Sequence, residues 1–181
     1  MKSLFSKRLI KYSVLSALFT SAAGTLLHFV YEWSGNNRLV GVFSAVNEST
    51  FEHLKLLFWP FLLTTFIGLF LFPDKRREFI TSSAVSVFLG MVLIITLFYT
   101  YSGALGKFYS AINIAIFFIS VIFSYYMLYA FMKNSTFDFN FSGFFGVLIF
   151  ILLIAAVISF TFLPPKIALF KDPLTGTFGF S

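Results

Sequence analysis

Five long apolar stretches alternate with short polar segments along the chain. They cover residues 9–31, 51–72, 79–101, 108–132 and 141–163. Each is as long as the roughly 20 apolar residues that an α-helix needs to cross the hydrocarbon core of a bilayer. Turn and stop signals separate them, namely the polar residues 34–37, the charged residues 73–78 and the Pro164–Pro165 pair. The pattern predicts an all-α polytopic membrane protein, one integral membrane domain over residues 1–181 with five transmembrane helices.

Composition supports this class and excludes others. Hydrophobic residues make up 59% of the chain and charged residues 11%, against about 25% charged in an ordinary soluble domain. A soluble globular domain, a disordered chain and a coiled coil are therefore excluded. The chain has 29 Phe, too many for one core of this size, so most of them are expected to face lipid. With no cysteine, disulfides, thiolate zinc sites and Cys nucleophiles are impossible.

The basic residues predict the orientation of the spans. If the N-terminus is cytoplasmic, eight basic residues lie inside and five outside, the inner ones being Lys2, Lys7, Arg8, Lys11, Lys75, Arg76, Arg77 and Lys133. The excess predicts an N-in, multi-pass protein of the cell membrane with its C-terminal tail, residues 164–181, outside. The net charge of +6 is explained by these flanking residues, so nucleic acid is not an expected partner. A cleaved signal peptide is the alternative for the N-terminus, but the apolar run continues past Ala23 to Tyr31.

Polar residues gather at the predicted outer ends of the first two spans. His28 and Glu32 are four residues apart and so project from one helix face. Glu48 and Glu52 have the same spacing at the entrance to the second span, with Glu48 either in its first turn or just outside the helix. Because imidazole nitrogens and carboxylate oxygens suit Zn²⁺, Mn²⁺ or Fe²⁺, we expect a divalent metal, Zn or Mn, held by His28, Glu52 and His53. Further ligand-binding groups of the same site are expected from Glu32, Asn47, Glu48, Lys55 and Asp172.

Simpler structural roles exist for the same residues. Ser49 and Glu52 match the S-x-x-E capping box of a helix N-terminus, and Asn47 is an alternative cap. Lys55 lies three residues after Glu52 and can pair with it or extend to the interface. A neutral His28 can hydrogen-bond to a neighbouring helix instead of binding a metal. At the opposite end, Asp74, Glu78 and Asp138 lie in predicted loops beside basic residues, where solvated ion pairs are expected.

The tail carries more aromatic residues than a solvated segment needs. Phe170, Phe178 and Phe180 accompany turn signals at Asp172–Pro173 and Thr175–Gly176. We therefore expect the tail to fold back at the outer face, which would bring Asp172 near the polar cluster.

The same segments resemble a known family. Residues 24–35, the N-E-S-x-x-E-H-x-K string at residues 47–55 and the D-P-x-T-G-x-F-G string at residues 172–179 resemble an uncharacterised family of small integral membrane proteins of low-GC Gram-positive bacteria. Phe51 departs from it, because the family often has Trp there. The family has no assigned activity, so the resemblance implies motif positions and no chemistry. These positions are His28, Glu32, Asn47, Glu48, Glu52, His53, Lys55 and Asp172.

Three functions remain open from the sequence. The first is an outward-facing His/Glu site that binds or transports a cation or small polar ligand. The second is a structural, assembly or signalling partner in the membrane. The third is a membrane-embedded metal-dependent hydrolase, although the chain has no H-E-x-x-H motif. The lipid bilayer is the expected partner, and a homo-oligomer or a larger membrane complex is compatible with the size of the chain.

Overall fold

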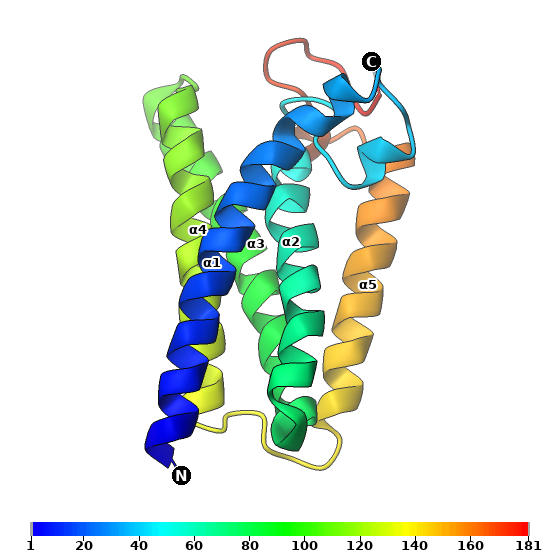
Figure 1. Cartoon of the computed structure of the whole chain (residues 1–181). Coiled ribbons are helices and arrows are strands. Elements are labelled where there is room, and N and C mark those ends of the chain that lie inside the picture. Colours follow the sequence, from blue (N-terminus) through cyan, green and yellow to red (C-terminus); the bar gives the residue numbers. More distant parts are fainter. Residues whose placement is uncertain (1, 181) are drawn as a thin grey trace.

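The computed structural model describes residues 2–180, and its long elements are all helices (Figure 1). They are α1 (Lys2–Trp33), α2 (Thr50–Leu71), α3 (Arg76–Leu105), α4 (Ser110–Lys133) and α5 (Ser142–Phe162). Short 3₁₀ turns lie between and after them: η1 (Val40–Val42), η2 (Pro73–Lys75) and η3 (Ala168–Phe170). All five long helices are long and apolar enough to cross a membrane. The predicted all-α fold of a multi-pass membrane protein is confirmed.

The helices run further than the apolar stretches from which they were predicted. α1 begins at Lys2 instead of residue 9, and α3 covers Arg76–Leu105 instead of residues 79–101. At 1.5 Å per residue, a helix of 30 residues is about 45 Å long, more than the roughly 30 Å of hydrocarbon. Apolar patterning therefore marks only the part of each helix that lies in hydrocarbon, and polar turns extend it at both ends.

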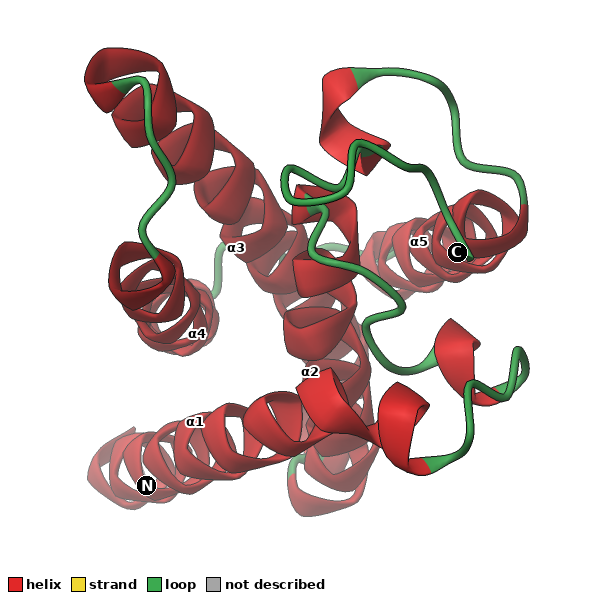
Figure 2. Cartoon of the chain, turned by 90° about the horizontal axis from the view of Figure 1, so that it is seen from above, coloured by secondary structure: helices red, strands yellow, loops and turns green. Residues whose placement is uncertain are grey.

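α3 packs against α2, α4 and α5, while α1 packs against α2 and α4, and α2 lies in the middle of the bundle (Figure 2). The up-and-down order places the N-terminus, η2 and residues 134–141 at one end, which we call the N-terminal end (Figure 1). Residues 34–49, the α3–α4 turn and the C-terminal tail lie at the other, the tail end. The tail folds back there as predicted, with the Phe170 side chain buried.

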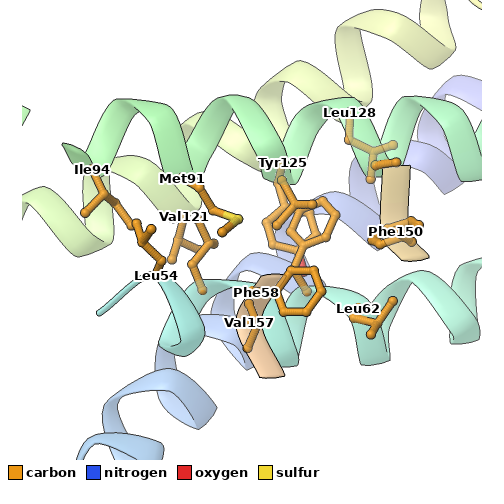
Figure 3. Packing of buried hydrophobic residues seen from close by; sticks show 14 of the residues in the cluster. Leu54, Phe58, Leu62, Met91, Ile94, Val121, Tyr125, Leu128, Phe150 and Val157 are labelled. Atoms are coloured by element: carbon orange, nitrogen blue, oxygen red, sulfur yellow. The ribbon is translucent and has the colours of Figure 1, made fainter. Parts of the chain in front are cut away.

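The core is built from large apolar side chains of four helices. Phe58 and Leu62 of α2, Met91 of α3, Tyr125 of α4 and Phe150 of α5 belong to this core (Figure 3). Other Phe side chains point outward, such as Phe70 and Phe144, which are 77% and 66% exposed. An apolar interior together with an apolar exterior is the surface pattern of a bundle that is solvated by lipid.

Hydroxyl groups join the helices inside this apolar core. The Tyr125 hydroxyl lies 2.7 Å from Thr20 Oγ1 and 2.6 Å from Thr64 Oγ1. The Tyr12 hydroxyl donates to the Thr64 carbonyl at 2.7 Å. These bonds connect α1, α2 and α4. A polar group inside a membrane bundle is stabilised by such a partner on a neighbouring helix.

One expectation for the N-terminal end is wrong. Glu78 was expected in a solvated ion pair, but its residue is only 3% exposed, and its carboxylate bonds Lys75 Nζ at 2.7 Å. Residues 73–78 were expected as a loop, but η2 leads directly into α3 at Arg76. Glu78 is thus in the first turn of α3, on a side that packs into the bundle.

Candidate metal centre at the tail end of the bundle

Two histidines and one glutamate converge at the tail end. His28 lies near the end of α1, His53 lies in the first turn of α2, and Glu48 precedes that helix by two residues. His28 Nε2 is 3.4 Å from Glu48 Oε1, and His53 Nε2 is 3.6 Å from Glu48 Oε2. One ligand atom from each residue lies within 4.8 Å of the other two. The three side chains are 23–42% exposed, so the group is partly open to the surroundings.

The hydrogen bond of His53 indicates which of its two ring nitrogens carries the proton when the ring is neutral. His53 Nδ1 lies 2.9 Å from the Ser49 carbonyl oxygen, which can only accept. The neutral ring therefore carries its proton on Nδ1, and Nε2 directs a lone pair toward Glu48. A lone pair and a carboxylate oxygen that face each other repel unless a proton or a metal ion lies between them. Backbone support of the outer ring nitrogen is also the usual arrangement of a histidine that binds a metal.

His28 has weaker support. Its Nδ1 atom is sealed from solvent and has no hydrogen-bond partner among the described residues. With no metal bound, a proton on Nε2 can be donated toward Glu48, which satisfies that side of the ring. A metal at Nε2 would move the proton to Nδ1, where it would be buried without an acceptor. His53 is accordingly the better supported of the two imidazoles.

Glu52, which was expected among the metal ligands, lies elsewhere. Its Oε2 atom is 2.5 Å from Lys55 Nζ and accepts the Val46 amide hydrogen at 2.9 Å. Successive helical residues point about 100° apart, so Glu52 and His53 of one helix turn face different directions. The structure brings Glu48 to the histidines in its place. Both Glu48 and Glu52 were candidate ligands from the sequence. The angular spacing within α2, which directs Glu52 away from His53, is the signal in the sequence that distinguishes the two carboxylates.

The Glu52–Lys55 pair organises the loop before α2. Both residues are buried, and Lys55 is fully so. Lys55 Nζ also donates to the Gly41 carbonyl at 2.7 Å and to Thr161 Oγ1 of α5 at 3.4 Å. The pair thus connects α2, α5 and residues 41–46. Lys55 was expected as a ligand-binding group, and the structure places its ammonium in this buried network, away from the three converging side chains.

Asn47 connects the loop to the tail. Its Oδ1 accepts the Ser49 amide hydrogen at 2.8 Å, and its Nδ2 donates to the Gly179 carbonyl at 2.8 Å. The S-x-x-E capping box, one of the alternatives for Ser49 and Glu52, is not formed, since Asn47, the other candidate cap, satisfies the Ser49 amide and Lys55 engages Glu52. The contact between residues 47 and 179 was not foreseen, because it joins two irregular segments.

The other two predicted site residues differ in their surroundings. Glu32 is exposed on the last turn of α1. Asp172 is 5% exposed, and its Oδ1 accepts the Leu174 and Thr175 amide hydrogens at 2.7 and 3.4 Å. This is a local turn that shapes the tail. The tail lies at the same end of the bundle as His28, Glu48 and His53, but Asp172 is not one of the three converging side chains.

A family model matches residues 1–180, which is nearly the whole chain. The chain belongs to DUF6512, a family of unknown function. No curated protein and no solved structure gives a significant match. Membership of DUF6512 agrees with the resemblance to an uncharacterised family and supplies no ligand or reaction. The geometry of His28, Glu48 and His53 is therefore the feature that points to a function.

Proposed function

We propose that this DUF6512 protein is a cell-membrane protein that binds a divalent transition-metal ion, Zn²⁺ in preference to Mn²⁺, at His28, Glu48 and His53. The observation that carries the proposal is the convergence of His28 Nε2 and His53 Nε2 on the two carboxylate oxygens of Glu48, at 3.4 and 3.6 Å. A bound cation would be coordinated by all three side chains. Two nitrogens and one oxygen are a ligand set that zinc accepts in sites with three protein ligands.

The spacing of the donor atoms supports the same ion. Zinc lies about 2.0–2.2 Å from nitrogen and oxygen ligands, so two ligand atoms in a tetrahedral site are roughly 3.3 Å apart. The two histidine–glutamate distances, each to a different oxygen of Glu48, are 3.4 and 3.6 Å, and one ligand atom from each of the three residues lies within 4.8 Å of the other two. Small side-chain movements therefore suffice to place the three donors around one ion. Mn²⁺ favours oxygen-rich, octahedral sites, which this nitrogen-rich group matches less well.

Three protein ligands leave the fourth position of a tetrahedral ion open. The side chains around it are 23–42% exposed, so water or a small polar ligand can reach that position. An open site suits binding and release of the ion, or presentation of the ion to a second ligand. A closed structural zinc site would instead use four protein ligands. We propose binding or transport of a cation or small polar ligand as the role of this protein.

We infer the side of the membrane from the basic residues. Lys75, Arg76 and Arg77 lie at the N-terminal end of the bundle, together with the start of α1. The positive-inside rule places that end in the cytoplasm. The tail end, with His28, Glu48 and His53, then faces the outside, where it would meet metal ions before any cytoplasmic component does.

The test is metal binding by the purified full-length protein in lipid nanodiscs. We expect one zinc per chain by elemental analysis after dialysis against buffered Zn²⁺. His53→Ala and Glu48→Gln should each weaken binding by about 10- to 100-fold or more, because each removes a ligand. Glu32→Gln is the matched control, since Glu32 is exposed at the same end, and it should keep the wild-type affinity. Wild-type protein without stoichiometric zinc would refute metal binding and favour a structural or signalling partner.

A further inference from the structure

An open cavity of about 610 Å³ lies at the N-terminal end of the bundle, opposite the candidate metal centre. Residues 73–78, from η2 and the first turn of α3, line one side of it. Residues 138–140 and Ser142, the first residue of α5, line the other. Small-molecule sites in proteins commonly measure about 300–1,000 Å³. This space, which we call the charged cavity, is therefore large enough for the headgroup of a phospholipid.

The first turns of α3 and α5 are joined beside the charged cavity. The Thr81 hydroxyl donates to the Ser142 carbonyl, and a Cβ atom added at Gly143 would lie 3.3 Å from Arg77 Cγ. The stem of Arg77 therefore packs on the start of α5. Among the described residues, neither helix has a side-chain cap. Two helix N-termini thus bring partial positive charge to one cavity, and such ends bind phosphate groups.

The charged cavity offers charges of both signs to a ligand. Arg76 and Arg77 line it and are exposed, and so are Asp74 and Asp138. In the part of the chain that the structure describes, none of these four side chains forms an ion pair within 4.0 Å. A ligand with one negative and one positive group would satisfy both kinds of charge, whereas a purely anionic ligand would be repelled by the two carboxylates.

Two buried polar atoms of the lining residues also have no partner. Ser142 is 1% exposed and Glu78 is 3% exposed, and both line the charged cavity. Ser142 Oγ and Glu78 Oε1 have no hydrogen-bond partner among the described residues, because Lys75 engages only the other oxygen of Glu78 at 2.7 Å. Buried polar groups without partners are costly. A ligand that accepts from the hydroxyl and donates to the carboxylate would remove both costs.

The surroundings of the charged cavity favour a membrane lipid over a soluble ligand. Phe139 lines the cavity and is 46% exposed, and the nearby Phe141 and Phe144 are 74% and 66% exposed. Large exposed aromatic side chains at the end of a membrane bundle suit contact with lipid. Basic pockets between transmembrane helices on the cytoplasmic side are also sites where lipid headgroups bind. The acyl chains of a bound lipid would lie against these phenylalanines.

We propose that the charged cavity binds the headgroup of a phospholipid that carries a phosphate and an ammonium group, as phosphatidylethanolamine does. Arg76 and Arg77 donate to the phosphate, because guanidinium groups match the spacing of phosphate oxygens. The ammonium group donates to Asp74, Asp138 and Glu78 Oε1. The carboxylates thereby select this headgroup against a purely anionic one, since repulsion of a competitor contributes to specificity.

The test is lipid binding by the full-length protein in detergent, measured by native mass spectrometry with a chelator present. Phosphatidylethanolamine, phosphatidylglycerol and phosphatidylcholine with identical acyl chains are titrated separately. We expect one phosphatidylethanolamine per chain, bound about 10-fold or more tightly than phosphatidylglycerol. Phosphatidylcholine should also bind more weakly, because its quaternary ammonium has no N–H to donate. Glycerophosphoethanolamine has the same headgroup without acyl chains and should bind about 10-fold or more weakly than the lipid.

Matched variants locate the site. Arg77→Gln keeps the stem that packs on Gly143 and removes the cation, so it should weaken phosphatidylethanolamine binding about 10-fold or more. Asp138→Asn should reduce the preference for phosphatidylethanolamine over phosphatidylglycerol, because one repelling carboxylate is lost. Lys133→Gln is the control, since Lys133 is an exposed cation at the same end that does not line the cavity. It should keep the wild-type affinities. Retained helical circular dichroism and elution volume show that each variant is folded.

The outcomes distinguish this proposal from metal binding. Phosphatidylglycerol bound as tightly as phosphatidylethanolamine would overturn it, and so would unchanged affinity in folded Arg77→Gln. Glycerophosphoethanolamine bound as tightly as the lipid would identify a soluble ligand and refute a lipid site. The proposal goes beyond metal binding and needs no ion at the other end of the bundle. Zinc binding without lipid preference would refute only the lipid site, and lipid preference without zinc binding would refute only the metal site.

Discussion

The ammonium of Lys55 lies 2.5 Å from the Glu52 carboxylate, and both groups are buried at the end of the bundle that carries the candidate metal centre. Lys55 also bonds the Gly41 carbonyl, and Glu52 bonds the Val46 amide. The loop that carries Glu48 is therefore held in place at Val46, two residues before Glu48. Glu52 and Lys55, which were expected to bind a metal or ligand, instead fix the position of Glu48, a candidate metal ligand.

We predict that Lys55→Met strongly destabilises the protein. It leaves the Glu52 carboxylate buried without its cation, and removing one partner of a buried pair costs about 3–5 kcal/mol. The double variant Glu52→Gln/Lys55→Met should recover part of this loss, since it removes the stranded charge. Denaturant titrations in detergent measure both. A double variant that is less stable than Lys55→Met by the full cost of Glu52→Gln alone would show that the two residues act independently.

We predict that Asn47→Ala loosens the loop from the tail. The variant loses the bonds to the Gly179 carbonyl and the Ser49 amide, each worth roughly 0.5–1.5 kcal/mol. Proteolysis at the tail should become faster, and zinc affinity should fall less than in Glu48→Gln. Asn140→Ala, at an exposed position of the opposite end, is the control. Equal proteolysis rates for the two variants would contradict a fastening role for Asn47.

We predict that Gly146→Ala disrupts the packing of α5 on α3. A Cβ atom at residue 146 would lie 2.6 Å from the Thr81 backbone nitrogen, and such overpacking costs about 1–3 kcal/mol. Gly103→Ala is the matched helical control, because nothing lies within 4 Å of its added Cβ and alanine favours helix by about 1 kcal/mol. Thermal melts should therefore shift in opposite directions. A shift of the same sign in both variants would argue against close packing at Gly146.

We predict that the tail end faces the outside of the cell. The chain has no cysteine, so single cysteines can be placed at Glu32 and Ser135, which are exposed at opposite ends of the bundle. A membrane-impermeant maleimide should label Glu32→Cys in intact cells and label Ser135→Cys only after lysis. Labelling of Ser135→Cys alone in intact cells would reverse the orientation.

The fold could be predicted almost completely from the sequence, and the site only in part. Apolar stretches of sufficient length allow only helices in a bilayer, and consecutive antiparallel spans bring His28 and His53 to one end. Glu48, and not Glu52, lies beside the histidines because of the direction in which each side chain leaves the backbone and because Lys55 is buried and pairs with Glu52. The composition of the chain predicts neither feature. The burial of Glu78 was missed for a similar reason. Its neighbours Arg76 and Arg77 suggested solvent, while the short η2 turn places it inside the bundle.

The metal site is tested most directly by X-ray absorption spectroscopy of the zinc-loaded protein. Coordination by His28, Glu48 and His53 predicts nitrogen and oxygen neighbours at about 2.0–2.2 Å from zinc, with outer-shell scattering from two imidazole rings. His28→Ala should reduce that scattering to one ring, and Glu52→Gln should leave two. A zinc environment of oxygen atoms without imidazole scattering in the wild-type protein would contradict the proposed site.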